Sequence, residues 1–280
     1  GRPFTPHARN EESTMYAFEL VRPKSLTDAS AALTQSGGKA LAGGQSLVAA
    51  MKLRLAQPGT LVDLSQLPEL RGISRQGTTI RIGAFTTHSE VAESNVVGDA
   101  IPALAALAHG IGDRQIRNVG TLGGSIAHND PAACYPAAIL ALEATIETTI
   151  RTIRADDFFI GMFETALSPG EIIVSVSFPI PKRAAYVKFP SPASRFALVG
   201  VFVADTAGGV RVAVTGAASC VFRCAELEKS LQKSFTPETA KATRVASSGL
   251  SSDLHGSPEY RAHLVPVLAA RAVAAAGSAH

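Results

Sequence analysis

The chain has 280 residues, of which 46% are hydrophobic and 18% are charged, and its net charge is +3. This length is sufficient for one large domain or two smaller ones, and the small net charge without a run of Lys or Arg argues against a nucleic-acid-binding surface. The longest apolar runs, 101–108 and 137–142, fall far short of the roughly 20 residues that cross a bilayer, and no signal-peptide pattern opens the chain.

The patterned sequence begins at Met15, whereas residues 1–14 are polar and unpatterned and are expected to be a tag or a disordered arm. From Met15 to Pro181, short strand patterns alternate with helical ones. The first helix is expected to begin at a Ser25 cap and to end at Gly37. Strands are expected at 39–42, 60–64, 70–74, 79–85, 144–150 and 172–178. Helices are expected at 25–37, 45–55, 86–93, 101–109 and 131–143.

The stretch Pro179-Ile-Pro181 marks a domain boundary, because the pattern changes after it. Three strands are expected there, at 185–189, 196–204 and 210–217. Three helices follow, at 225–232, 237–246 and 257–276. Pro266 lies inside the last helix and should kink or divide it. Strands followed by helices are typical of an α+β domain, so we expect one domain at 15–181 and a second at 182–280.

The three cysteines predict a reducing compartment, which we take to be the cytoplasm. Cys134, Cys220 and Cys224 are odd in number and form no CxxC pair. Disulfide frameworks and zinc or iron–sulfur sites need paired or closely grouped cysteines. We therefore expect free thiols, and no metal site built by this chain alone.

Two glycine-rich segments indicate the binding chemistry. They are Leu41-Ala-Gly-Gly-Gln-Ser-Leu47 and Gly120-Thr-Leu-Gly-Gly-Ser-Ile-Ala-His-Asn-Asp-Pro131. Glycine allows close approach of the backbone and a positive φ, and a helix N-terminus favours an anion. The two segments could therefore hold a diphosphate from both sides. Neither contains GxxxxGK[ST] or GxGxxG, and the pattern alone is also consistent with two tight turns between strand and helix.

These segments belong to a longer resemblance that extends in order from about Met15 to Ala276. The similar stretches are Ala42-Gly-Gly-Gln-Ser-Leu47 with Met51-Lys-Leu-Arg54, Ile82-Gly-Ala-Phe-Thr-Thr-His88, Arg117 to Pro131, Asp157-Phe-Phe159 with Gly161, Leu167-Ser-Pro-Gly-Glu-Ile-Ile173, Tyr186-Val-Lys-Phe189, Ala193-Ser-Arg-Phe-Ala197, and Glu259-Tyr-Arg-Ala-His-Leu264 with Arg271-Ala272. The sequence thereby resembles the FAD-binding medium subunit of the xanthine dehydrogenase and carbon monoxide dehydrogenase family, the molybdenum hydroxylases.

The resemblance implies an α+β protein. Its FAD-binding domain would have two subdomains, as in flavoproteins of the vanillyl-alcohol-oxidase (PCMH) type, and a small α+β domain would follow. The implied cofactor-binding residues are Leu41, Ala42, Gly43, Gly44, Gln45, Ser46, Leu47, Ile111, Thr121, Leu122, Gly123, Gly124, Ser125, Asp130, Cys134, Ile173 and Lys188. No catalytic residue and no metal ligand is implied for this chain.

The implied roles differ between these residues. The two glycine segments would hold the diphosphate and the ribityl chain, Ile173 would contact the flavin or the adenine, and Lys188 would approach from the second domain or remain solvated. Asp130 would lie beside the cofactor or cap the helix expected at 131–143. Ile111 would be a cofactor contact or part of the core. His128 would be structural or a proton shuttle.

One position departs from the family pattern. Cys134 stands where the family usually carries a second acidic residue that bonds to the cofactor, and a thiol is a poor hydrogen-bond acceptor. We also expect that Val at Gly44 or at Gly123 lowers FAD affinity at least tenfold, about 1.4 kcal/mol, with the fold retained.

The family implies an electron relay. Substrate would be oxidised at a molybdenum cofactor in a large subunit, electrons would pass through two [2Fe–2S] clusters in a small subunit, and FAD in this chain would deliver them to an external acceptor. The assembly would be a dimer of heterotrimers, without nucleic acid. The sequence of this chain identifies neither the substrate nor the electron acceptor of the assembly. Two alternatives remain open: a self-contained FAD-dependent oxidase, and a nucleotide-binding subunit without a redox role.

Overall fold

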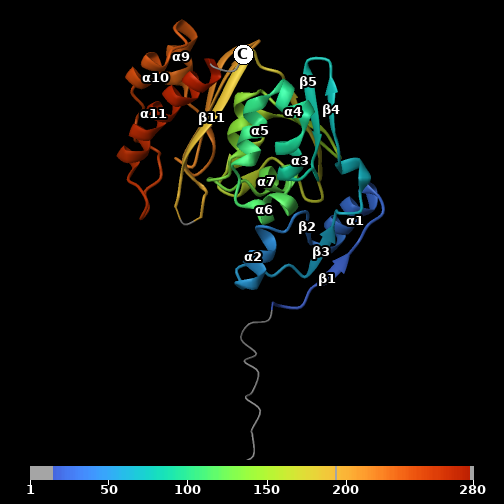
Figure 1. Cartoon of the computed structure of the whole chain (residues 1–280). Coiled ribbons are helices and arrows are strands. Elements are labelled where there is room, and N and C mark those ends of the chain that lie inside the picture. The colour runs from blue at the N-terminus through green and yellow to red at the C-terminus, as the bar shows by residue number, and fades with distance from the viewer. Residues whose placement is uncertain (1–14, 193, 278–280) are drawn as a thin grey trace, which may run out of the picture.

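A computed structural model describes residues 15–192 and 194–277 (Figure 1). The expected arm at 1–14 lies outside the described residues. The described chain forms a small parallel sheet, a five-stranded antiparallel sheet, a β-hairpin and a four-stranded antiparallel sheet. Among the described helices, none is long and apolar enough to cross a membrane.

The N-terminal lobe is a three-stranded parallel sheet with two helices. Its strands are β1 (Glu19–Val21), β3 (Thr60–Asp63) and β2 (Lys39–Leu41), in that order across the sheet. Helix α1 (Leu26–Ser36) begins at Ser25, whose side chain accepts a hydrogen bond from the Asp28 N–H, and ends at Gly37 with φ of 59°. Both helix ends agree with the expected cap and stop signals. Helix α2 (Leu47–Lys52) directly follows the first glycine segment.

The central body is a five-stranded antiparallel sheet covered by short helices. The sheet order is β4 (Ile73–Gln76), β5 (Thr79–Gly83), β10 (Ile173–Pro179), β6 (Thr145–Thr148) and β7 (Thr152–Arg154). The helices are α3 (His88–Glu93), α4 (Asn95–Ala100), α5 (Pro102–His109), α6 (Arg114–Val119), α7 (Leu122–His128) and α8 (Tyr135–Ala141). Two 3₁₀ turns, η2 (Pro68–Leu70) and η3 (Ala155–Asp157), and a hairpin of β8 (Phe159–Gly161) and β9 (Glu164–Thr165) complete it.

The second glycine segment is largely helical, although the sequence predicted no helix between 101–109 and 131–143. Thr121 caps α7 by accepting the Gly124 N–H, and Gly123 and Gly124 lie within the helix. Glycine costs about 1 kcal/mol in a helix relative to Ala, so tertiary packing overrides the local preference here. The helix expected at 131–143 is also shorter, because residues before Tyr135 form a turn.

The C-terminal part is a sheet between two helical layers. Its strands are β11 (Arg183–Pro190), β12 (Ala197–Thr206), β13 (Gly209–Thr215) and β14 (Phe222–Arg223). Helices α9 (Ala225–Lys233), α10 (Pro237–Ala242) and α11 (Pro258–Gly277) lie on its outer side, whereas α5 and α8 contact it from the central body (Figure 1). Pro266 lies inside α11 but does not divide it.

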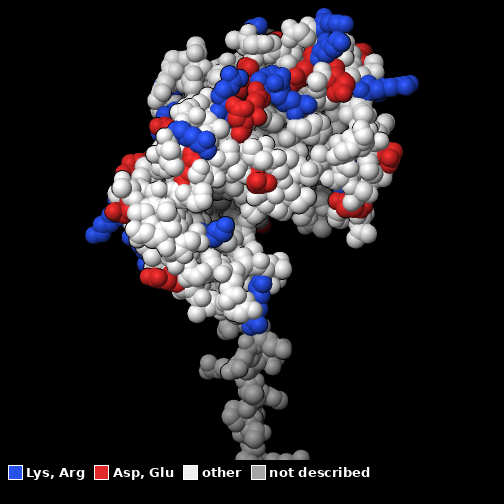
Figure 2. Space-filling model, turned by 180° about the vertical axis from the view of Figure 1, so that it is seen from behind, with Lys and Arg blue, Asp and Glu red and all other residues white. Residues whose placement is uncertain are grey.

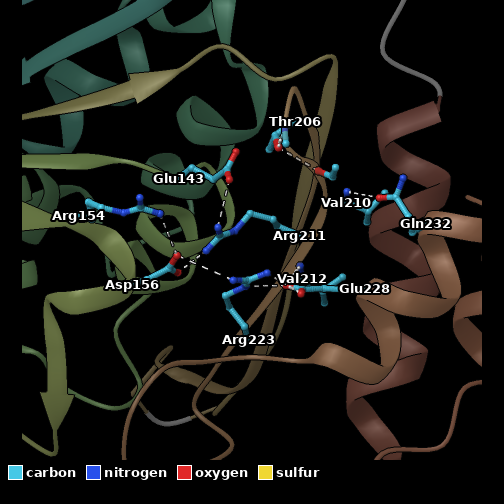
Figure 3. A network of polar contacts seen from close by, with 12 residues as sticks. Glu143, Arg154, Asp156, Thr206, Val210, Arg211, Val212, Arg223, Glu228 and Gln232 are labelled. Atoms are coloured by element: carbon cyan, nitrogen blue, oxygen red, sulfur yellow. Dashed lines mark hydrogen bonds and ion pairs between the residues drawn. The ribbon is translucent and has the colours of Figure 1, made fainter.

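Two sets of contacts join the C-terminal sheet to the central body. The Gly216 N–H and the Thr215 hydroxyl both lie within hydrogen-bond distance of the Pro131 carbonyl, at 2.7 and 2.9 Å. Farther along β13, the buried Arg211 forms ion pairs with Glu143 and Asp156 (Figure 3). The second contact set is a charged network, which Arg154 and Arg223 extend around Asp156.

Candidate functional site

A cleft of about 660 Å³ lies where the N-terminal lobe meets the rest of the molecule. Its walls include both glycine segments, residues of α5–α6 and residues of β10, β11 and the loop after β11. The space-filling view shows the surface hollowed between the lower lobe and the larger body above it (Figure 2). Ligand pockets commonly measure about 300–1,000 Å³, so the cleft has the size of a cofactor site.

The implied cofactor-binding residues converge on this cleft, with one exception. Leu122 points into the hydrophobic core and is fully buried. The residues that line the cleft are Leu41, Ala42, Gly43, Gly44, Gln45, Ser46, Leu47, Ile111, Thr121, Gly123, Gly124, Ser125, Asp130, Cys134, Ile173 and Lys188. They come from five separated parts of the chain, which the fold brings together.

The first glycine segment leaves its backbone donors free. Among the described residues, no protein acceptor takes the N–H groups of 43–46, although Gly44 and Ser46 accept bonds through their carbonyls. Gly44 has φ of 67°, which favours glycine. Gly43 lies directly against the second segment, because an added Cβ would stand 2.2 Å from the Val119 carbonyl oxygen. Consecutive free N–H groups in such a turn are suited to a diphosphate.

The second glycine segment uses its donors within the fold instead. The N–H groups of Leu122, Gly123 and Gly124 bond to Thr86, Ala84 and the Thr121 hydroxyl. A Cβ on Gly123 would stand 2.6 Å from the Ala84 Cβ. The expectation that Gly123→Val spares the fold is therefore wrong, because Gly123 packs on Ala84, directly after the end of β5. This segment offers the cleft hydroxyl groups and a close backbone rather than a row of free N–H groups.

Asp130 and His128 end this segment at the cleft. Asp130 Oδ1 accepts the Ala132 N–H at 2.8 Å, so the carboxylate caps a turn and not the first turn of α8. The other carboxylate oxygen has no protein partner among the described residues. His128 packs its ring against Phe163, 5.0 Å between centroids. Asn129, with φ of 46°, donates to the carbonyls of Gly161 and Glu164 and so fixes the β8–β9 hairpin beside the cleft.

Lys188 enters the cleft from the C-terminal sheet with all its donors engaged. Its Nζ donates to the Gly110 and Arg195 carbonyls at 2.7 and 3.0 Å and lies 3.6 Å from Cys134 Sγ. An ammonium group has three donors, and each has a protein partner here. Tyr186, on the same strand, has its pKa raised well above the ordinary value by burial and by the neighbouring Cys134.

Several cleft residues were not singled out as cofactor contacts from the sequence. They are Phe163, Glu171 and Arg195, together with His88. His88, Glu171 and Arg195 lie in stretches that carry the resemblance, so that signal could have identified them. Phe163 lies outside those stretches, and its φ of 57° is a property of the folded backbone that the sequence does not predict. Glu171 is held by Arg151 at 3.1 Å, by Thr148 and by the Ser168 N–H, and these bonds lower its pKa to about 2 against the effect of burial.

His88 makes the protein sensitive to mild acid. Burial, with a smaller effect of Arg117, lowers the pKa of His88 from 6.5 to about 4. Between these values the unfolded state binds a proton that the folded state does not, so stability falls as pH falls through this window. We expect the free energy of unfolding to be about 2 kcal/mol lower at pH 5 than at pH 7, measured by urea denaturation.

His88→Gln is the matched control for this effect and should remove most of the difference between pH 7 and pH 5. Glu171 cannot account for it, because stabilisation by a carboxylate with a lowered pKa is lost only below about pH 4.5. An unchanged pH dependence in His88→Gln would contradict the assignment to His88.

The fold and the cleft are typical of a protein that binds a nucleotide cofactor, and paired glycines line the cleft where a dinucleotide fingerprint is absent. Residues 16–181 match the family described as "FAD binding domain in molybdopterin dehydrogenase". The chain is 39% identical over 277 residues to the nicotine 6-hydroxylase medium subunit of Paenarthrobacter nicotinovorans, covering 94% of this chain and 98% of that one. It is 36% identical to the carbon monoxide dehydrogenase medium chain of Hydrogenophaga pseudoflava, covering 92% and 96%.

A solved structure of carbon monoxide dehydrogenase from Hydrogenophaga pseudoflava superimposes with a TM-score of 0.86 at 35% identity, covering 95% of this chain and 99% of that chain. The chain belongs to the FAD-binding domain family of the molybdopterin dehydrogenases, as a medium subunit. The resemblance found in the sequence, the α+β fold class and FAD as the cofactor of this oxidoreductase family are thereby confirmed.

Proposed function

We propose that this chain is the electron-relay subunit of a molybdenum hydroxylase. The observation that supports the proposal is the cleft, where the N–H groups of 43–46 have no protein acceptor among the described residues and Gly43 lies against the start of the second glycine segment. In this proposal a partner subunit with two [2Fe–2S] clusters delivers electrons to FAD. A large subunit holds the molybdenum cofactor, where it binds and oxidises the substrate. The relatives act on molecules as different as nicotine and carbon monoxide, which is consistent with a substrate site outside the medium subunit.

The residues of this chain would bind and orient FAD and keep water from it. When bound, FAD supplies the redox chemistry, and the protein supplies placement and electrostatics. The N–H groups of 43–46 would hold the diphosphate, with the Ser46 and Ser125 hydroxyls beside it. The apolar side chains of Ile111 and Ile173 would contact the rings. The proposed division is an FAD-binding domain at 15–181 and a C-terminal α+β domain at 182–280, and the latter contributes Lys188 to the cleft.

We expect the chain to hold one FAD without a covalent bond. Among the described residues that line the cleft, the only cysteine is the buried Cys134, whose Sγ lies against Lys188. Denaturation should therefore release free FAD in about a one-to-one ratio with protein, measured by absorbance after removal of the polypeptide. A protein that stays colourless when FAD is added would contradict the proposal.

We expect the isolated chain to oxidise no organic substrate. No group of three or more His, Cys, Asp or Glu side chains able to hold a metal occurs in the described part of the chain. Activity with a dye acceptor should appear only when the large and small subunits are added, and the complex should have the mass of a dimer of heterotrimers. Turnover of an alcohol, aldehyde or heterocycle by the chain alone would favour a self-contained oxidase, and FAD bound without any redox function in the complex would favour a structural subunit.

A further inference from the structure

Two cations that line the cleft, Lys188 and Arg195, and a third, Arg117, gather around the backbone of residues 110–112. Lys188 Nζ donates to the Gly110 carbonyl at 2.7 Å. Arg117 donates to the carbonyls of Ile111 and Gly112 at 3.1 and 3.4 Å, and Arg195 donates to the Gly112 carbonyl at 3.4 Å. We call Lys188, Arg117 and Arg195 the cation cluster.

The cation cluster has no carboxylate partner in the described part of the chain. None of its members forms an ion pair there, and their acceptors are backbone carbonyls and one thiol. Asp113 accepts the Ile116 N–H as the cap of α6, and Asp130, which also lines the cleft, accepts the Ala132 N–H, so neither forms an ion pair with the cluster. Carbonyl oxygens satisfy the donors without cancelling the charge, so the positive charge of the cluster is not neutralised by a direct ion pair.

This charge acts at a distance. The three donors of Lys188 are already taken by Gly110, Arg195 and Cys134, so the ammonium group influences a ligand mainly by its field. The surrounding cleft wall is partly apolar, with Ile111 and Phe196 beside it, and a field is screened less in such a place than in water. A carboxylate at position 134 would neutralise the ammonium by a charge-assisted hydrogen bond, whereas a thiol does not.

Of the parts of FAD, only the isoalloxazine gains negative charge when the cofactor is reduced. The adenine is neutral in both states, and in the proposed site the diphosphate would have its own partners in the free N–H groups of 43–46. We propose that the cation cluster raises the reduction potential of FAD by stabilising the reduced cofactor. Lys188 would contribute most of this electrostatic effect, and the thiol of Cys134 leaves the charge of Lys188 uncompensated. The inference rests on the proposed function, because it requires a redox-active FAD in this cleft.

The test measures the two-electron midpoint potential of the full chain loaded with FAD, by spectroelectrochemical titration. Lys188→Met removes the charge, and Cys134→Asp adds a compensating carboxylate. Each should shift the equilibrium between oxidised and reduced FAD at least tenfold toward the oxidised form, about 30 mV for a two-electron couple. The matched controls are Lys188→Arg, which keeps the charge, and Cys134→Asn, which has the shape of Asp without its charge; both should stay within threefold of the original chain.

FAD content and affinity are measured on the same samples, so that failure of the inference about the reduction potential can be distinguished from failure of the proposed function. Potentials of Lys188→Met and Cys134→Asp that match their controls, with one FAD still bound, would overturn the inference and leave the proposed function intact. A large loss of FAD affinity in Lys188→Met without a change in potential would also overturn it, since the charge would then serve the diphosphate. If Lys188→Met does not fold, the comparison of Cys134→Asp with Cys134→Asn decides. A chain that binds no FAD at all would remove the proposed function and the inference together.

Discussion

Replacing Gly43 with Ala is expected to lower the affinity for FAD at least tenfold, about 1.4 kcal/mol, and to destabilise the fold by about 1–3 kcal/mol. The added Cβ would stand 2.2 Å from the Val119 carbonyl oxygen and 2.8 Å from the Gly120 Cα. Both of those atoms belong to backbone, so the two glycine segments must move apart. The free N–H groups of 43–46 would then lose their position opposite the second segment. Fluorescence titration with FAD and urea denaturation measure the two effects.

Gly98→Ala is the matched control for Gly43→Ala. Gly98 lies in α4, and a Cβ there would meet no atom within 4 Å. We expect this variant to bind FAD normally and to be stabilised by up to about 1 kcal/mol. Gly44→Val should keep the fold and lose affinity, because its added Cβ meets only the side chains of Val48 and Leu41 while its φ of 67° disfavours Val. Unchanged FAD affinity in both Gly43→Ala and Gly44→Val would remove the first glycine segment from the cofactor site.

Changing Glu143 and Asp156 together to Gln and Asn is expected to destabilise the protein by roughly 2–4 kcal/mol. Both carboxylates pair with Arg211, whose side chain is only 7% exposed (Figure 3). The double variant leaves a buried guanidinium without a counter-charge, which is the costly way to break such a network. The value is below the full range for buried pairs, because the carboxylates are themselves about a third exposed and partly screened. Urea denaturation at neutral pH measures the effect.

Arg211→Met distinguishes a buried uncompensated charge from loss of the ion pairs alone. It leaves two carboxylates that water can reach, so we expect the free energy of unfolding to fall by less than about 1.5 kcal/mol, which is less than in the double variant. Glu147→Gln, in the exposed pair with Arg81, should cost less than about 1 kcal/mol. If Arg211→Met lowers the free energy of unfolding as much as the double variant or more, the buried guanidinium charge is not the main cause of the destabilisation in the double variant.

The sequence predicted the longer strands because their signals are local, whereas the short strands β1, β7, β8, β9 and β14 were not predicted. The strands at 39–42, 60–64 and 172–178 agree with β2, β3 and β10 within a residue or two. The first glycine segment was also identified correctly as a turn before a helix, since paired glycines and a following helical pattern are neighbours in the chain. Turns and caps of this kind depend on a few adjacent residues, and this makes them predictable from sequence.

The second glycine segment was predicted less well because its structure depends on distant residues. Helix α7 forms although it contains two glycines, since Gly123 packs on Ala84 and its N–H bonds to the Ala84 carbonyl. The meeting of Lys188 with Cys134 joins positions 54 residues apart. Neither contact leaves a periodic signal in the sequence, and only the resemblance to a family suggested that these parts of the chain meet.

The bonds from Thr215 and Gly216 to the Pro131 carbonyl fasten β13 to the turn that carries Asp130 and Cys134 into the cleft. A ligand that touches both walls binds only the docked arrangement of the two parts, so its binding free energy also holds them together. At a free concentration one hundred times its dissociation constant, such a ligand adds about 2.7 kcal/mol. FAD would thus stabilise the docked arrangement of the two parts. A protease that cuts near Pro181 should therefore cleave the FAD-loaded chain more slowly than the FAD-free chain.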